Sequence, residues 1–394
     1  MLITFVEKIM NPFIISEYKG RTFFCDREQE TKNIINAINN GRDITLVSLR
    51  KMGKTGLLMH TFEELKKKKT FETIYLDIYH TENLKGMINQ LATSLFRLKK
   101  TFGKKMEEFL HAFRYVRPVI SMDQLTGLPL VSFTITDEKE ARNTLEELFE
   151  MLRERGKRIS IVIAIDEFQQ IGNYPEKNVE ALIRGMIQTL SNVRFIFSGS
   201  NKTILTRMFG NATQPFYQST EMMYLAEIEQ ETYKKFIKTQ FLKDSRQVEE
   251  GIITELLLWC RCHTWYVQYV CNKLYETGNQ ISKENYKNIQ REILTGREPF
   301  YLEYRNMLTH HQWQLMKAIA RSDGANMITS GSFIKKHNLT NASTIKRGVN
   351  SLLQKEMIYQ KNENLYVYDV FFSRWLEMQG GPPIITSFSA TNIY

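Results

Sequence analysis

Short β-prone runs that alternate with helical segments constrain the fold of this chain more than any other feature. Strands are expected at residues 44–49, 73–78, 160–166, 193–199 and 222–228. Several of these runs are continuously apolar, as in strands that helices cover on both faces. Helical segments such as residues 143–155 and 179–190 lie between them. This alternation predicts an α/β fold with a parallel sheet.

One segment interrupts the alternation before the third strand. Between Arg117 and Ile135, two β-prone runs flank a turn that contains Gly127 and Pro129. The pattern predicts an inserted hairpin at about residues 117–135.

The second half of the chain is predominantly helical. Helices are expected at residues 231–242, 248–259, 265–277, 309–321, 330–336 and 341–355. The last three precede two β-prone runs that flank the polar residues 361–364. Three helices and a hairpin are the parts of a winged helix-turn-helix. We therefore predict a core over residues 1–230, a helical domain over 231–298 and a winged-helix domain with a C-terminal tail over 299–394.

Composition and length narrow the class of protein. A chain of 394 residues is longer than one hydrophobic core ordinarily organises. Its content of 42% hydrophobic and 24% charged residues excludes a disordered or fibrous protein. No apolar run reaches the length of roughly 18 residues that a membrane span needs. The N-terminal stretch lacks the regions of a secretion signal. We expect a cytoplasmic protein without a membrane partner.

The cysteines and the net charge indicate the class of protein less specifically than length and composition do. The four cysteines are too few for a disulfide framework and indicate a reducing compartment. With His263, three of them (Cys260, Cys262 and Cys271) lack the paired spacing of a zinc site, which favours buried structural cysteines. The adjacent His310 and His311 are expected at the surface. The net charge of +10 is compatible with a polyanionic partner.

The strongest chemical motif is Gly53-Lys54-Thr55, which follows the first apolar run. It is the end of a phosphate-binding loop, although Ser48 stands where that pattern begins with glycine. Gly53 lets backbone N–H groups approach phosphate oxygens, Lys54 supplies a charge, and the Thr55 hydroxyl is a Mg²⁺ ligand. The start of the following helix adds its positive dipole end. The expected nucleotide-binding residues of this loop are Ser48, Arg50, Lys51, Met52, Gly53, Lys54, Thr55 and Gly56.

Two adjacent carboxylates follow the apolar run at residues 161–165. At the end of a buried strand they require a cation or a polar partner. We expect Asp166 to hold Mg²⁺ and Glu167 to be the general base, with Lys54 contributing to catalysis. A solvent-exposed strand end is the alternative. After the next strand, Ser200 or Asn201 would contact the γ-phosphate or the attacking water, and an ordinary turn is equally compatible with this segment.

Together with Phe24, Asp26-Arg27-Glu28, the DEFQ segment at 166–169 and residues 195–200, these motifs resemble the archaeal-type ATPases of the STAND class. Those proteins are relatives of the AAA+ ATPases and also occur in bacteria. The similarity extends through "CRCHTWYVQ" (260–268) to "VYDVFFSRWL" (367–376). The resemblance implies a switch ATPase that uses ATP and Mg²⁺, with a helical lid, a winged helix and slow turnover. It also implies that Phe24 and Arg27 line the adenine pocket and that His263 approaches the phosphates from the lid.

Several alternatives stay open at this point. The chain would also suit a DNA-binding initiator or regulator, or a nucleotide-binding scaffold without hydrolysis. On the last long helix, Lys346 and Arg347 are compatible with DNA contacts, but that helix equally suits packing against the ATPase domain of the same chain. In the second case, the partner of the protein would be an unidentified protein. Arg194 and Arg207 are candidates for an arginine finger, although most arginines are solvated surface residues.

Overall fold

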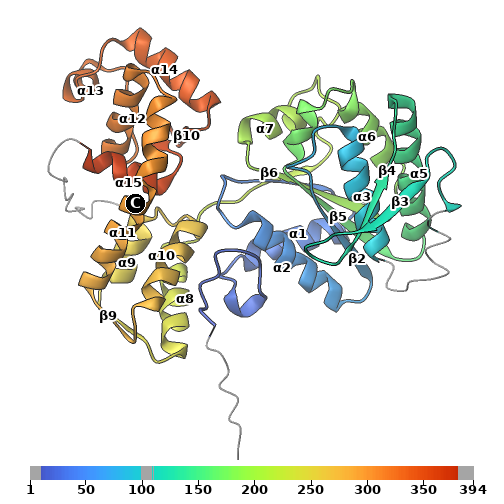
Figure 1. Ribbon diagram of the computed structural model, residues 1–394, viewed down its shortest axis with the longest axis horizontal. Coiled ribbons are helices and arrows are strands. Elements are labelled where there is room, and N and C mark those ends of the chain that lie inside the picture. Colours follow the sequence, from blue (N-terminus) through green and yellow to red (C-terminus); the bar gives the residue numbers. More distant parts are fainter. Residues whose placement is uncertain (1–9, 99–108, 110, 380–394) are drawn as a thin grey trace, which may run out of the picture. The chain divides into compact units, whose positions relative to one another are not determined.

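The computed structural model describes residues 10–98, 109 and 111–379, which form two compact units (Figure 1). We call Ser16–Ile228 the α/β unit. The helical unit comprises residues 10–15 and the chain from Glu229 onward, so it contains both the predicted helical domain and the predicted winged helix. Residues 380–394, at the end of the predicted winged-helix domain with its tail, and most of the N-terminal stretch lie outside the described residues.

The α/β unit is built on a five-stranded parallel sheet, as predicted. Its strands, in spatial order, are β2 (Phe71–Asp77), β5 (Ser160–Asp166), β6 (Val193–Gly199), β1 (Ile44–Val47) and β7 (Glu221–Tyr224). The bounds of β5 and β6 agree with the prediction. β7 ends earlier than residue 228 because its neighbour β1 ends at Val47, whose carbonyl accepts the last ladder hydrogen bond from Leu225.

Helices cover both faces of this sheet (Figure 1). One face packs against α1 (Glu28–Asn39) and α2 (Lys54–Lys67), and the other against α3 (Leu84–Leu98), α5 (Glu138–Gly156), α6 (Val179–Ile187) and α7 (Lys202–Gly210). Along β5, Val162 and Ala164 join the first core, whereas Ile161, Ile163 and Ile165 join the second. Burial on both faces therefore explains why the run is continuously apolar. Two 3-10 helices, η1 (Arg21–Phe23) and η2 (Phe168–Asn173), complete the unit.

The inserted hairpin is present as β3 (Pro118–Met122) and β4 (Pro129–Phe133), which pair antiparallel. Val131 and Phe133 of β4 are buried in the core beneath α3. The Thr93 hydroxyl of α3 accepts from the amide of Val131 at 2.9 Å, so α3 fixes this strand. The insertion is thus part of the α/β core.

The helical unit begins with four helices and a short parallel strand pair. These are α8 (Gln230–Lys243), β8 (Gln247–Val248), α9 (Ile252–Trp259), α10 (Thr264–Glu276), β9 (Gln280–Ile281) and α11 (Lys283–Asn306). The predicted winged helix follows as α12 (His310–Ser322), α13 (Gly331–Lys336), α14 (Ala342–Gln354), β10 (Ile358–Lys361) and β11 (Asn364–Val367). The β-prone end of the predicted hairpin instead starts a further helix, α15 (Val370–Met378), which the Asp369 side chain caps.

Two arginines connect the parts of the helical unit. Arg261, which follows α9, donates to Asp323 at 2.7 Å and to Ser373 at 2.8 Å. Arg374 of α15 donates to the carbonyl oxygen of Trp259 at 3.0 Å and to Asp323 at 3.3 Å. Hydrogen bonds that involve a charged group are stronger than those between neutral groups. The bonds of these two guanidinium groups therefore hold α15 against the end of α9.

Phe371 and Phe372, at the start of α15, organise the aromatic core of the helical unit. Their rings contact four tryptophans: Phe371 contacts Trp259 and Trp265, and Phe372 contacts Trp313 and Trp375. Both phenylalanines are buried. These contacts span the predicted helical domain and the predicted winged helix, which explains why the two form one unit.

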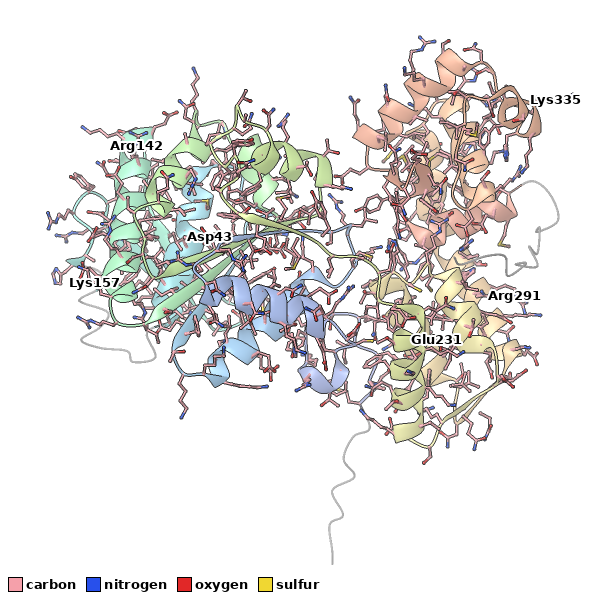
Figure 2. The ribbon with its side chains drawn as sticks, turned by 180° about the vertical axis from the view of Figure 1, so that it is seen from behind. Asp43, Arg142, Lys157, Glu231, Arg291 and Lys335 are labelled. Atoms are coloured by element: carbon pink, nitrogen blue, oxygen red, sulfur yellow. The ribbon has the colours of Figure 1, made fainter. Side chains whose placement is uncertain are left out.

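Charged side chains cover the outside of both units. Figure 2 shows Arg142 and Lys157 projecting from α5 and its C-terminal end, Arg291 from α11 and Lys335 from α13, and all four are exposed. In the part of the chain that the structure describes, no helix is long and apolar enough to cross a membrane.

Candidate functional site

The predicted site residues meet where the carboxyl ends of β1, β5 and β6 come together. Val47 of β1 pairs with Gly199 of β6, and Ser48 donates its amide to the Gly199 carbonyl oxygen at 3.3 Å. Asp166 ends β5, the strand on the other side of β6. The phosphate-loop motif, the acidic pair and Ser200 therefore lie at one edge of the sheet, which is where ligands bind in open α/β sheets.

The loop after β1 turns sharply into α2. Gly53 caps this helix with φ 84°, a left-handed conformation that favours glycine, and Lys51 also has a positive φ. The helix begins at Lys54 and has 14 residues. Its first N–H groups lack partners within the helix and carry the positive dipole end, so this turn suits an anion.

Arg27 and Ser48 hold the loop. Arg27 is 3% exposed, and its guanidinium donates to Glu30 at 2.8 Å and to the Met52 carbonyl oxygen at 3.4 Å. Ser48, at the position of the usual first glycine, is buried and donates its hydroxyl to the Leu49 carbonyl oxygen at 2.9 Å. The serine is therefore accommodated by a local hydrogen bond. The contact of Arg27 with the loop itself does not follow from the sequence pattern.

Lys54 lies at the centre of the site. Its ammonium is 3.1 Å from Asp166 Oδ1 and 3.1 Å from Glu167 Oε1, and its side chain is 8% exposed. The hydroxyl of Thr55 donates to Asp166 Oδ2 at 3.1 Å. The structure thus brings together Lys54, Thr55, Asp166 and Glu167, for which the sequence predicts phosphate, metal and base roles.

Asp166 has two further donors that the sequence analysis did not identify. Ser198 of β6 donates to it at 2.6 Å, and Tyr75 of β2 donates at 2.9 Å. Burial opposes ionisation of Asp166, but the Lys54 charge and these hydrogen bonds outweigh it and lower the pKa of the carboxyl. Burial and the charge of Asp166 raise the pKa of Tyr75, so its phenol stays protonated and donates. Asp166 is held as a carboxylate.

The donor set fits Mg²⁺ and a phosphate group. A hydroxyl and an ionised carboxylate, from Thr55 and Asp166, are hard oxygen ligands of the kind that Mg²⁺ prefers. Lys54 and the start of α2 together provide the positive charge that a nucleotide phosphate requires. These residues would hold the metal and the phosphates on one side of the sheet edge.

Glu167 leaves the strand with φ 56°, which is uncommon for a residue other than glycine. Besides Lys54, the Ser200 hydroxyl donates to its Oε2 at 3.0 Å. Arg50 in turn donates to Ser200 at 3.4 Å. Asn201 instead caps α7 by accepting from the Ile204 amide. Of the two residues considered at this strand end, Ser200 is therefore the one beside the acidic pair.

An aromatic cluster of Tyr18, Phe24 and His60 lies beside the first turns of α2. Phe24 stacks on His60 with ring centroids 4.7 Å apart, and Tyr18 hydrogen-bonds His60 Nδ1 at 2.8 Å. A Cβ at Gly56 would be 3.3 Å from the Phe24 ring. Burial lowers the pKa of His60, which favours a neutral imidazole. This arrangement suits the predicted adenine side of the site; the involvement of Tyr18 and His60 was not predicted.

Other candidates lie elsewhere. His263 precedes α10 in the helical unit, where it is 1% exposed and its ring centroid is 6.2 Å from that of Tyr359. Its approach to the phosphates stays a prediction. Arg194 lies at the start of β6, the end opposite the site, where it donates to the carbonyl oxygens of Val193 and Ser191. Arg207 lies in α7. Action of either arginine on a neighbouring molecule also stays a prediction.

Of the three cysteines expected to be buried, two are buried and Cys262 is half-buried. Cys260 and Cys271 are fully buried, and burial raises the pKa of both thiols. Over residues 10–98, 109 and 111–379, no group of three or more histidine, cysteine, aspartate or glutamate side chains is arranged to hold a metal ion.

Comparisons with known proteins agree with this geometry. Residues 24–258 match the family described as "ATPase domain predominantly from Archaea", and residues 299–378 match a "probable winged helix domain". Among curated proteins, no sequence matches this chain significantly.

Two solved structures illustrate the fold. The Walker-type ATPase paby2304 of Pyrococcus abyssi has a TM-score of 0.65 and 16% identity, over 93% of this chain and 99% of that chain. The ORC2 protein of Aeropyrum pernix, solved as ADPNP–ADP complexes, has a TM-score of 0.56 and 12% identity, over 94% of this chain and 98% of that chain. The likeness shows an ATPase-type α/β sheet followed by helices and a winged helix.

The ionisation of Asp166 predicts how stability depends on pH. Its lowered pKa means that it stabilises the fold above a pH of about 4 and that this contribution is lost as the pH falls further. In Asp166→Asn, the fall in the free energy of unfolding between about pH 7 and about pH 3 should therefore be smaller than in the parent protein. Urea denaturation followed by circular dichroism measures this.

The matched control is Asp77, which pairs in register with Asp166. Partial desolvation, and then the charges of Asp166 and Glu167, raise the pKa of Asp77, so protonation of Asp77 favours the folded state. Asp77→Asn should make the acid-induced fall larger. Equal falls in the three proteins would contradict the opposite ionisation of the two carboxyls.

Proposed function

We propose that this chain, which belongs to the family of ATPase domains found predominantly in Archaea, is a Mg²⁺-dependent switch ATPase. It would hydrolyse ATP to ADP and phosphate. One observation carries the proposal: the Lys54 ammonium lies 3.1 Å from both carboxylates at the end of β5. The STAND-type motifs and the free cysteines support membership of that class and a reducing, cytoplasmic setting.

Binding of the nucleotide uses the start of α2. Lys54 would exchange its carboxylate partners for β- and γ-phosphate oxygens, which the first N–H groups of the helix also contact. Thr55 and Asp166 would hold Mg²⁺, which supplies Lewis-acid stabilisation of charge on the phosphates. Phe24, next to Gly56, would face the adenine.

The two adjacent carboxylates are suited to different roles. The Asp166 side chain is 5% exposed and receives hydrogen bonds from Thr55, Tyr75 and Ser198, which supports its proposed role as a metal ligand. The Glu167 side chain is 19% exposed and is therefore more accessible to solvent than Asp166. Glu167 would take the proton from the attacking water as general base, while Ser200 holds its other oxygen.

Lys54→Ala tests binding. The variant removes the positive charge from the phosphate position, so ATP affinity should fall at least tenfold, or about 1.4 kcal/mol. Isothermal titration calorimetry measures the affinity. Lys67→Ala, at the exposed other end of α2, is the control and should bind ATP normally. Unchanged affinity in folded Lys54→Ala protein would refute this assignment.

Glu167→Gln separates binding from hydrolysis. The variant keeps the shape of the side chain and removes the base, so ATP should still bind while turnover falls by about a hundredfold or more. A phosphate-release assay measures turnover. If the variant hydrolyses ATP normally, another group activates the water; if the parent protein shows no turnover, the nucleotide-binding scaffold is the better description.

The helical unit is the proposed output of the switch. Because Arg261 and Arg374 join its parts through Asp323, the lid and the winged helix would respond to the nucleotide as one body and change the binding of a protein partner. The DNA-binding alternative relies on Lys346 and Arg347, which are exposed on α14. Two cations support only weak, salt-sensitive binding of DNA. Each phosphate contact contributes about −0.9 to the slope of log affinity against log salt concentration.

Hydrogen exchange tests the two outputs. Exchange over residues 308–376 should differ between the ATP-bound and the ADP-bound protein. A switch requires that ATP and ADP favour different conformations, and a ligand shifts a conformational equilibrium only if it binds the two conformations with different affinity. Charge reversal of Lys346 and Arg347 should leave ATP turnover near normal. Nanomolar, sequence-selective binding of duplex DNA that is lost in this double variant would favour the DNA-binding alternative.

A further inference from the structure

Gln169, in the first turn of η2, hydrogen-bonds the proposed general base. Its side-chain amide donates to Glu167 Oε2, the same oxygen that accepts from Ser200 at 3.0 Å. An ionised carboxylate only accepts, so the nitrogen of the amide must face Glu167 and its oxygen must face the other way. The position of η2 is fixed by Phe168, which is fully buried against Phe197 with ring centroids 4.4 Å apart.

The space for the Gln169 amide exists because residue 199 is a glycine. A Cβ at Gly199 would lie 1.9 Å from Gln169 Oε1 and 2.8 Å from Leu205 Cδ1. Gly199 has no left-handed φ, so its backbone conformation does not demand glycine. The requirement is close approach: the Gln169 side chain lies directly against the end of β6.

This arrangement is unfavourable for the Gln169 side-chain oxygen. The oxygen is buried and accepts no hydrogen bond from any residue that the structure describes. A buried acceptor without a partner costs free energy and calls for an explanation. The explanation is that the side chain is placed so that its amide donates to Glu167. Only a glycine at position 199 leaves space for this placement.

The two oxygens of Glu167 therefore have different surroundings. Oε2 accepts from Gln169 and Ser200, whereas Oε1 faces the Lys54 ammonium at 3.1 Å. When Lys54 binds phosphate oxygens instead, Oε1 loses that partner and Oε2 keeps both of its donors. Oε1 would then be the oxygen that accepts the proton of the attacking water.

We infer that Gln169 is a positioning residue that fixes Glu167 through Oε2, and that Gly199 provides the space for it. The inference rests on the proposed function, because it assigns the orientation of the proposed base. It predicts that removal of the Gln169 donor impairs turnover without impairing ATP binding.

The first experiment replaces Gln169 with methionine, which has similar length and cannot donate. Gln169→Met should lower turnover about tenfold, the effect of one hydrogen bond to a charged group, and leave ATP affinity unchanged. In Glu167→Gln protein, the same replacement should lower the residual single-turnover rate no further, since no base remains to be positioned. Equal losses in both backgrounds, or no loss in either, would overturn the inference.

Gln170→Met is the matched control. Gln170 is the next residue of η2, but its amide donates to the Thr81 carbonyl oxygen at 3.0 Å and not to Glu167. Turnover of this variant should equal that of the parent protein. A loss equal to that of Gln169→Met would indicate a general effect of η2 and would also overturn the inference.

A second double-mutant cycle, which combines Gly199→Ala with Gln169→Ala, tests the role of Gly199 independently. Gly199→Ala should reduce turnover in the parent background by displacing the Gln169 amide, while ATP affinity shows that the site is intact. In Gln169→Ala protein, the same change should have a smaller further effect, because the atom nearest to the new Cβ, Gln169 Oε1, is then absent. Equal losses in both backgrounds would overturn the role of Gly199.

The outcomes also separate this inference from the proposed function. If the parent protein does not hydrolyse ATP, the proposed function fails. If Glu167→Gln abolishes hydrolysis and Gln169→Met changes nothing, only the role of Gln169 fails.

Discussion

The ion cluster of Lys54, Asp166 and Glu167 is the interaction on which the rest of the α/β unit depends. Lys54 belongs to the helix after β1, and the carboxylates follow β5, so the cluster spans β6, which lies between these strands. Removal of charged groups from water is costly unless each has a partner. Two carboxylates around one ammonium would suit the divalent cation of the proposed function.

Much of this site could be predicted because it follows from local sequence. A buried strand followed by Gly53-Lys54-Thr55 and a second buried strand ending in Asp166-Glu167 define the two sides of the cluster, and parallel pairing brings their ends together. The continuous apolar runs identified the strands for the same physical reason: helices bury both faces. Element ends were harder to predict. For instance, α5 begins at Glu138, earlier than expected, because the Asp137 side chain caps it.

Residues whose contacts depend on tertiary structure could not be predicted in this way. Tyr75 reaches Asp166 because β2 and β5 are neighbours in a particular register, which no local pattern encodes. The close approach of Gln169 and Gly199 joins an η-helix to the end of another strand. Arg261 and Arg374 are far apart in the sequence and meet at Asp323. A single arginine in a helical pattern gives no sign of such a partner.

The aromatic core around Phe371 and Phe372 has a spectroscopic consequence. All four tryptophans of the chain lie in the helical unit, and residues 16–228 contain none. Indole emission responds to the polarity and motion around the ring, so intrinsic tryptophan fluorescence of the unmodified protein reports on the helical unit alone. The candidate nucleotide site, formed in the α/β unit, contributes no indole emission of its own. A change in emission on addition of nucleotide would thus report a response of the helical unit, recorded without any attached dye.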